Sequence, residues 1–224
     1  MTLSTGDWVR VAEELLATPA PGALEALHPR FNVAPTQAHP IVVSEGGPKV
    51  DHNVLTLAHW GFPGKQQGPL VINARSETAL TKPLFRTAFA QHRCVVVADG
   101  FIEWRKSATG RQPLWFRRKD GRPLYLAGLY LPGGATAKGS PTRFVVLTTS
   151  PNHLVAPVHD RMPAVLSPQD ALTWLAHPAG EVLRPAPDAW LASTEISPRI
   201  NNTANDDPAC LEPATSTRQQ LALF

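Results

Sequence analysis

The chain has 224 residues, 43% of them hydrophobic, and a formal net charge of +3. This length and composition suit one large hydrophobic core, and no apolar run approaches the length that spans a membrane. We therefore expect a soluble, cytoplasmic protein whose slightly basic balance permits an anionic partner. The only two cysteines, Cys94 and Cys210, predict neither a disulfide framework nor a metal cluster.

The first third of the chain contains one clear helix pattern followed by strand patterns. Trp8–Leu16 has an amphipathic spacing, with Ser4 or Thr5 available as the N-cap and with Pro19 and Pro21 expected to end the helix. The elements expected after it are a strand at 41–43, a turn at 46–48, a strand at 54–60, a polar loop at 61–68, a turn at 71–78 and a helix at 82–91 with Pro83 at its first position.

The stretch Arg93–Trp104 organises the middle of the chain. Within it, the apolar run Cys94–Ala98 predicts a strand that is buried on both faces. Asp99 and Gly100 form a turn signal, and 101–104 predicts a strand that returns from this turn as a hairpin. Later elements are expected as strands at 114–117, 124–131 and 144–149, a helix at 171–176 that starts near Ser167, and a frayed tail at 217–224. These patterns predict one α+β domain.

Glu103 is a single carboxylate between two large apolar residues, Ile102 and Trp104. Burying such a group costs free energy unless it is paired, so its pKa should be raised if it faces a dry pocket. A raised pKa would suit a general acid. The alternative is a solvent-facing residue that alternates with its apolar neighbours along the strand.

Two other polar positions follow apolar segments. Asn73 precedes Arg75 by two residues, so one turn can present an amide that orients a reacting oxygen and a guanidinium that suits a phosphate. The alternative is that Asn73 serves only to form the turn, which is the commoner role of an asparagine at such a position. His159, beside Asp160 and Arg161, is either a proton-transfer group or a structural histidine. The sequence contains no phosphate-binding glycine loop, zinc spacing or serine elbow, so we expect neither a cofactor nor a metal.

Five motifs occur in a specific order along the chain: Arg30–Thr36, His59–Phe62, Ile72–Thr78, Ala98–Trp104 and His159–Pro163. In this order they resemble the SOS-response-associated peptidase (SRAP) family of abasic-site processing proteins. The similarity extends from about Arg30 to Pro213. It implies a single SRAP-like domain over 1–216, with a β-rich, barrel-like core of mixed or antiparallel strands and flanking helices.

The resemblance implies a monomer that senses abasic sites in single-stranded DNA and is nucleoid-associated when bound. In this chemistry, autopeptidase removal of the initiator methionine exposes an N-terminal cysteine. Its amine condenses with the abasic-site aldehyde and its thiolate closes a thiazolidine. A 1,2-aminothiol traps an aldehyde better than an amine alone because the ring closure is intramolecular.

The resemblance also implies roles for individual residues. Glu103 matches the acid–base glutamate, His159 the histidine that assists proton transfer at the Schiff base, and Asn73 the asparagine that orients the cysteine. The implied DNA contacts are Arg75 and Arg161 for phosphates, Pro35 and Trp60 for an apolar wedge, and Asn32 and Thr149 as further binding residues.

The chain departs from the family at its beginning, because Met1-Thr2-Leu3 stands where relatives have Met-Cys-Gly-Arg. One hypothesis is a start at an internal methionine, with Cys-Gly-Arg encoded just upstream. The other is true loss of the nucleophile, which leaves a non-covalent binder of single-stranded or junction DNA. Thr2 is a poor substitute, because in this register it lies four residues, or about 13 Å, beyond the cysteine position. Neither Cys94 nor Cys210 has a terminal amine.

A second departure is the loop 61–68, which is shorter than the tryptophan-containing segment of many relatives. This difference concerns the surface that unstacks DNA. A third functional reading, suggested by the family's name, is a peptidase that acts on other proteins. Salt-dependent binding to single-stranded DNA would argue against that reading.

Overall fold

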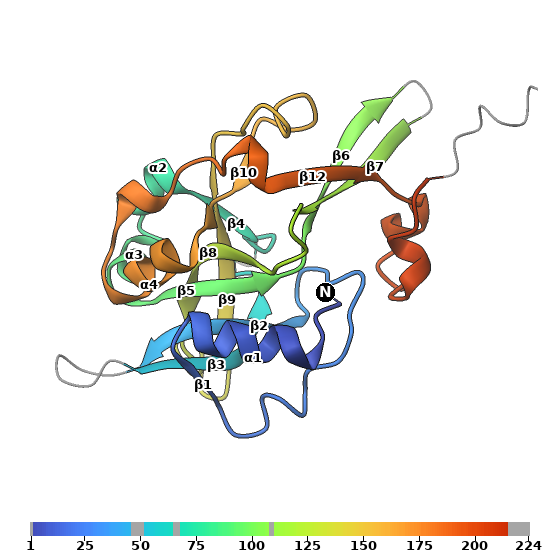
Figure 1. Ribbon diagram of the computed structural model, residues 1–224. Coiled ribbons are helices and arrows are strands. Elements are labelled where there is room, and N and C mark those ends of the chain that lie inside the picture. Colours follow the sequence, from blue (N-terminus) through green and yellow to red (C-terminus); the bar gives the residue numbers. More distant parts are fainter. Residues whose placement is uncertain (1, 46–51, 65–67, 108–109, 215–224) are drawn as a thin grey trace, which may run out of the picture.

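The computed structural model describes residues 2–45, 52–64, 68–107 and 110–214. Five strands form its centre: β2 (Ala38–Glu45), β3 (His52–Trp60), β5 (Arg93–Ala98), β8 (Leu124–Leu131) and β9 (Arg143–Thr149). Antiparallel pairing connects them in the order β3-β2-β5-β8-β9. A short parallel pairing of β3 with β9, at His59 and Trp60, closes the ring. The expected α+β fold with a mixed, barrel-like core is therefore confirmed (Figure 1).

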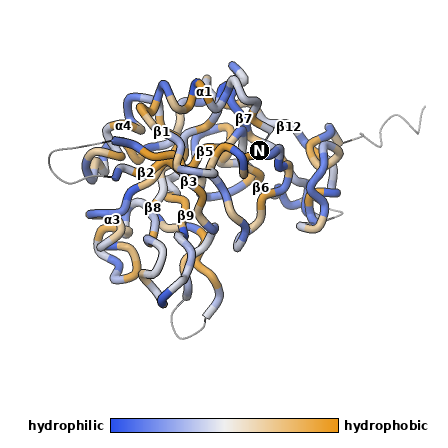
Figure 2. The backbone as a smooth tube through the Cα atoms, turned by 90° about the horizontal axis from the view of Figure 1, so that it is seen from below, coloured by the Kyte–Doolittle hydropathy of each residue, from blue (hydrophilic) through white to orange (hydrophobic). Residues whose placement is uncertain are grey.

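The remaining elements surround this barrel. They are α1 (Thr5–Glu14), β1 (Ala17–Pro19), β4 (Asn73–Arg75), α2 (Ser76–Ala79), α3 (Arg86–Gln91), β10 (Met162–Pro163), β11 (Val165–Leu166), α4 (Pro168–Ala176) and the 3-10 turns η2 (Gly180–Val182), η3 (Asp188–Trp190), η4 (Pro198–Asn201) and η5 (Pro208–Cys210). A second, three-stranded sheet has the order β12-β7-β6, from β12 (Leu191–Glu195), β7 (Gly110–Arg118) and β6 (Phe101–Ser107). In Figure 2 the apolar segments gather on the central strands, and the N-terminal end lies close to β5 and β6.

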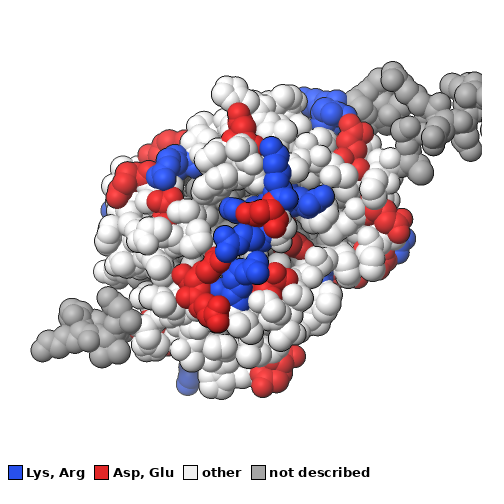
Figure 3. Space-filling view, viewed as in Figure 1, with Lys and Arg blue, Asp and Glu red and all other residues white. Residues whose placement is uncertain are grey.

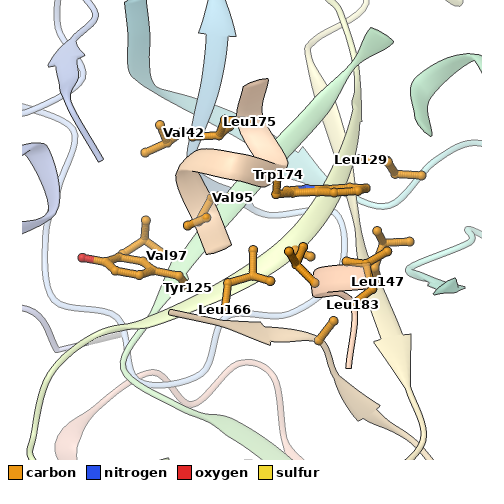
Figure 4. Packing of buried hydrophobic residues seen from close by; sticks show 14 of the residues in the cluster. Val42, Val95, Val97, Tyr125, Leu129, Leu147, Leu166, Trp174, Leu175 and Leu183 are labelled. Carbon is orange, nitrogen blue, oxygen red and sulfur yellow. The ribbon is translucent and has the colours of Figure 1, made fainter. Parts of the chain in front are cut away.

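The main core lies between the barrel and the helices that cover it. All six residues of β5 are buried, which confirms the prediction for Cys94–Ala98. Trp174 on α4 points into the apolar cluster that Figure 4 shows, and its indole N–H donates to the carbonyl oxygen of Cys94 at 3.1 Å. Truncating a fully buried tryptophan typically costs about 3–5 kcal/mol, so this contact anchors α4 on the barrel.

Arg93 is a buried arginine that sequence reasoning did not single out. Its Nε donates to the carbonyl oxygen of Trp174 at 2.8 Å, and Nη1 donates to that of Ala90 at 2.5 Å. These acceptors lie near the C-terminal ends of α4 and α3, where helix carbonyls lack partners within the helix and favour a cation. The guanidinium therefore joins two helix ends to the barrel.

The predicted hairpin at Asp99 and Gly100 is wrong. Both edges of β5 are occupied by β2 and β8, and β6 instead pairs with β7 in the smaller sheet. The connection from β5 to β6 requires a residue without a side chain at position 100, because a Cβ on Gly100 would lie 2.0 Å from Nε1 of Trp115. The turn therefore carries the chain from the barrel into the second sheet, and it takes Glu103 with it.

Two helix boundaries also differ from expectation. Ser4, one of the two predicted N-cap candidates, caps α1 through a capping box with Asp7, but the helix ends at Glu14, well before Pro19. Leu16 takes a positive φ of 49°, and the next residues pair with β3 as β1, so tertiary strand pairing ends the helix before the prolines do. The helix expected at 82–91 begins only at Arg86.

Helix α4 begins at Pro168 behind the N-cap Ser167, which confirms the helix start predicted near Ser167. The expected turn at 46–48 and tail at 217–224 lie outside the described residues, as do parts of the loop at 61–68 and the strand connection at 108–109. Within the described residues, every helix is too short or too polar to cross a bilayer.

Candidate active site

A cavity of about 240 Å³ opens where the barrel meets the smaller sheet. Its lining residues are Asn73, Arg75, Glu103, Thr148, His159, Arg161 and Pro163. Asn73, Glu103 and His159, which come from three separate stretches of the chain, therefore share one cavity. The structure thus brings together the three residues to which the family resemblance assigns catalytic roles.

Strand β9 explains how two of these stretches come together. Thr148 pairs with Arg75 of β4 on one edge of β9 and with Pro163 of β10 on the other. The segment that carries Asn73 thus lies on one side of β9, and the segment that follows His159 lies on the opposite side. The end of β9 forms the floor between them.

Glu103 enters the same cavity from β6, where it is paired with Leu114 of β7. The carboxyl group is half-buried, and this burial raises its pKa above the ordinary value. The nearby His159 opposes the rise, and Asp160 adds to it. A carboxyl group in such a setting can hold a proton at a higher pH than an exposed glutamate and can deliver it to a bound reactant.

His159 is held by the backbone of Arg161. Its Nδ1 lies 3.0 Å from the Arg161 N–H and 3.0 Å from the Arg161 carbonyl oxygen. An unprotonated Nδ1 accepts from the first group, and a protonated Nδ1 donates to the second. Nδ1 of His159 therefore has a backbone partner in either tautomer of the ring.

The two arginines of the cavity differ in their surroundings. Arg161 is 18% exposed and forms a bidentate ion pair with Glu77. Arg75 is exposed and makes no ion pair within the described part of the chain. The guanidinium of Arg75 thus faces solvent at the rim of the cavity, whereas the guanidinium of Arg161 is already oriented by Glu77.

Trp60 and Pro35 lie near Asn73, which belongs to strand β4 where the sequence predicted a turn. The Trp60 indole N–H donates to the carbonyl oxygen of Ile72 at 2.9 Å, and the ring stacks on Phe144 with an interplanar angle of 8°. The backbone carbonyl oxygen of Trp60 accepts from the backbone N–H of Thr36 at 2.8 Å, and Thr36 directly follows the exposed Pro35. These contacts fix a half-buried aromatic residue and an exposed proline beside β4.

Asn32 and Thr149 are buried, with exposures of 8% and 4%. The Asn32 amide donates to the carbonyl oxygens of Ile200, Asn202 and Asn205, at 3.1, 3.1 and 3.0 Å. Neither Asn32 nor Thr149 lines the cavity.

The neighbouring Thr148, which lines the cavity, was not selected from the sequence, although strand alternation makes either threonine of this pair a candidate. Glu77 and Pro163 were also missed. Glu77 belongs to a recognised motif, but the sequence does not show that it pairs with an arginine 84 positions away.

Both cysteines are buried, and burial raises the pKa of the Cys94 thiol. Neither of them lines the cavity. Within the described residues, histidine, cysteine and acidic side chains form no group of three or more that could hold a metal ion.

The chain has relatives of known name and structure. Residues 4–203 match the family described as SOS response associated peptidase (SRAP). The abasic site processing protein YoqW of Bacillus subtilis is 30% identical over 199 residues, which cover 83% of this chain and 86% of YoqW. The abasic site processing protein YedK of Escherichia coli is 35% identical over 150 residues, which cover 65% of this chain and 64% of YedK.

A crystal structure of a protein from Bacteroides thetaiotaomicron superimposes with a TM-score of 0.75, at 22% identity, over 92% of this chain and 96% of that one. This likeness concerns the fold alone. The sequence match covers most of the chain, and the chain therefore belongs to the SRAP family.

Proposed function

We propose that this protein processes abasic sites in single-stranded DNA, and that the cavity is its reactive site. The observation that carries the proposal is the convergence of Asn73, Glu103 and His159 in one cavity that also contains two arginines. The named relatives, which are abasic site processing proteins, support the choice of substrate.

The chemistry begins with ring opening of the abasic deoxyribose, which exposes its aldehyde. Glu103 donates and accepts the protons of sugar ring opening, and the raised pKa of this carboxyl group favours the acid form that such a step needs. An N-terminal amine then attacks the aldehyde carbon and releases water as the imine forms. His159 moves protons at this stage, while Asn73 orients the N-terminal residue.

The covalent product requires a thiol next to that amine. Addition of the thiol sulfur to the imine carbon, with transfer of its proton to nitrogen, closes a thiazolidine without any other reactant. Because Cys94 and Cys210 are buried, we propose that the thiol belongs to a cysteine placed ahead of Thr2 and exposed by autopeptidase removal of methionine.

DNA contact in this proposal combines phosphate binding and stacking. Arg75 and Arg161 contact phosphates, and Pro35 and Trp60 form the apolar edge against which a base unstacks. Asn32 and Thr149 contribute from beneath the surface by shaping the segments around the cavity. On the face that Figure 3 shows, basic side chains form an interrupted band mixed with acidic ones, so that face offers no unbroken basic surface.

A second candidate function is non-covalent binding of single-stranded or junction DNA. The burial of both cysteines favours it for a protein that consists of the printed residues alone. A denaturing gel separates the two functions. The printed chain and a chain extended by Met-Cys-Gly-Arg are each incubated with an abasic oligonucleotide, and only the extended chain should give a complex that survives denaturation.

A further inference from the structure

Glu77 and Arg161 connect the two sides of the cavity. Nη1 of Arg161 donates to Oε1 of Glu77 and Nη2 to Oε2, each at 2.8 Å, and Nη2 also donates to the Thr148 carbonyl oxygen at 2.5 Å. Glu77 follows β4, which carries Asn73, and Arg161 precedes β10 on the opposite edge of β9. The ion pair therefore bridges the end of β9.

This ion pair orients the Arg161 guanidinium more than it stabilises the folded protein. Glu77 is 52% exposed, and pairs with an exposed partner contribute little to the free energy of folding. Two parallel N–H···O bonds to a planar guanidinium do, however, fix its position and direction. The hydrogen bonds from Arg161 also lower the pKa of Glu77, so the carboxylate stays charged at neutral pH.

The position of the His159 ring depends directly on Arg161. The N–H and carbonyl groups of Arg161 are the two backbone partners of Nδ1 of His159. A shift of the Arg161 backbone would therefore move the imidazole relative to Glu103, which lines the same cavity.

We propose that Glu77 is a positioning residue of this site: by holding Arg161 across β9, it fixes the imidazole of His159 relative to Glu103 and Asn73. The inference rests on the function proposed above. It differs from a simpler role, in which Glu77 competes with DNA phosphate for Arg161. In that role, removing the carboxylate would free the guanidinium and tighten DNA binding.

The test compares Glu77→Gln with Glu77→Asp in the chain extended by Met-Cys-Gly-Arg. Glu25→Gln is the matched control, because Glu25 is exposed and lies outside the cavity lining. The rate of crosslinking at saturating abasic oligonucleotide is measured across pH, and the Kd is measured with an oligonucleotide that carries a non-reactive tetrahydrofuran site.

Glu77→Gln should slow crosslinking roughly 10- to 100-fold and change its pH profile, as misplacement of a reacting group does, while the Kd stays within about twofold. Glu77→Asp keeps the charge and should retain more of the rate. Tighter binding by Glu77→Gln with an unchanged rate would overturn the proposal in favour of competition, and unchanged values of both would overturn it outright.

Nuclear magnetic resonance separates a failure of this inference from a failure of the proposed function. The ring signals and pH titration of His159 are followed in free protein, without DNA. Glu77→Gln should change both, and Glu25→Gln should change neither. A His159 titration that is identical in all three proteins would overturn the positioning role, whether or not the extended chain crosslinks.

Discussion

Thr2 binds Asp99: its hydroxyl donates to Oδ2 of the carboxylate at 2.8 Å, and its backbone N–H donates to the same oxygen. Asp99 precedes the Gly100 crossover, and Glu103 lies four residues further along the chain. Four extended residues span about 13 Å, so residues placed ahead of Thr2 would begin near Asp99 at a reachable distance from Glu103. Figures 1 and 2 both place the N-terminal end beside β5 and β6.

Asp99→Ala should release the N-terminal segment, because it removes the acceptor of both Thr2 hydrogen bonds. The amide hydrogen of Thr2 should then exchange faster with solvent, while the amides of β5 stay protected. In the extended chain the same change should slow crosslinking, since the reacting amine is less well placed. Hydrogen exchange measured residue by residue checks this, and equal exchange at Thr2 in both proteins would contradict the anchoring role.

His39 should make the folded state sensitive to acid. It is 6% exposed, its Nε2 lies 2.7 Å from the Val97 carbonyl oxygen, and burial lowers its pKa to about 4. The unfolded chain has a histidine pKa of about 6.5, so between these values only the unfolded state binds the proton. The free energy of unfolding should therefore fall as pH drops from about 6.5 to 4, by about 3 kcal/mol from this residue.

Chemical denaturation of wild type and His39→Gln at several pH values measures this contribution. All other groups, including Glu103, titrate in both proteins, so the difference between the two curves isolates His39. The Gln variant should lose stability less steeply between pH 6.5 and 4. Parallel curves over this range would show that His39 is protonated as easily in the folded as in the unfolded state.

Arg75 should contact one DNA phosphate, because it is the cavity arginine without an ion pair in the described part of the chain. Arg75→Ala should weaken binding to single-stranded DNA and reduce the slope of log K against log salt by about 0.7. Arg86→Ala removes another exposed arginine, which lies in α3 outside the cavity lining, and should leave the slope unchanged. An unaltered slope for Arg75→Ala would limit this residue to a structural role in β4.

Local patterns predicted the parts of the fold that depend on neighbours in sequence. The apolar run Cys94–Ala98 predicted a strand buried on both faces, and the apolar flanks of Glu103 predicted a raised pKa. The hairpin prediction failed because the partners of β5 are β2 and β8, which lie far away in sequence. A turn signal such as Asp99-Gly100 shows that the chain bends, but not which strand it meets afterwards.

The site itself depended on contacts between distant segments. Spacing left open whether Asn73, Glu103 and His159 converge, because convergence depends on β4 and β10 flanking β9. The order of the family motifs supplied the candidates. The sequence did not identify Glu77, because its ion pair is with one arginine that lies far away in the sequence.

The most direct test of the proposed chemistry compares two extended chains, one with Glu103 and one with Glu103→Gln. The quantity measured is the rate at which each chain forms a denaturation-resistant complex with an abasic oligonucleotide. The Gln variant should react about 10²- to 10⁴-fold more slowly, the usual contribution of a general acid–base group. The Glu103 protein should lose rate as pH rises through the raised pKa of this carboxyl group, because its acid form disappears. Equal rates for the two proteins, or equal crosslinking by the printed chain, would contradict the assignment of Glu103 and of the N-terminal nucleophile.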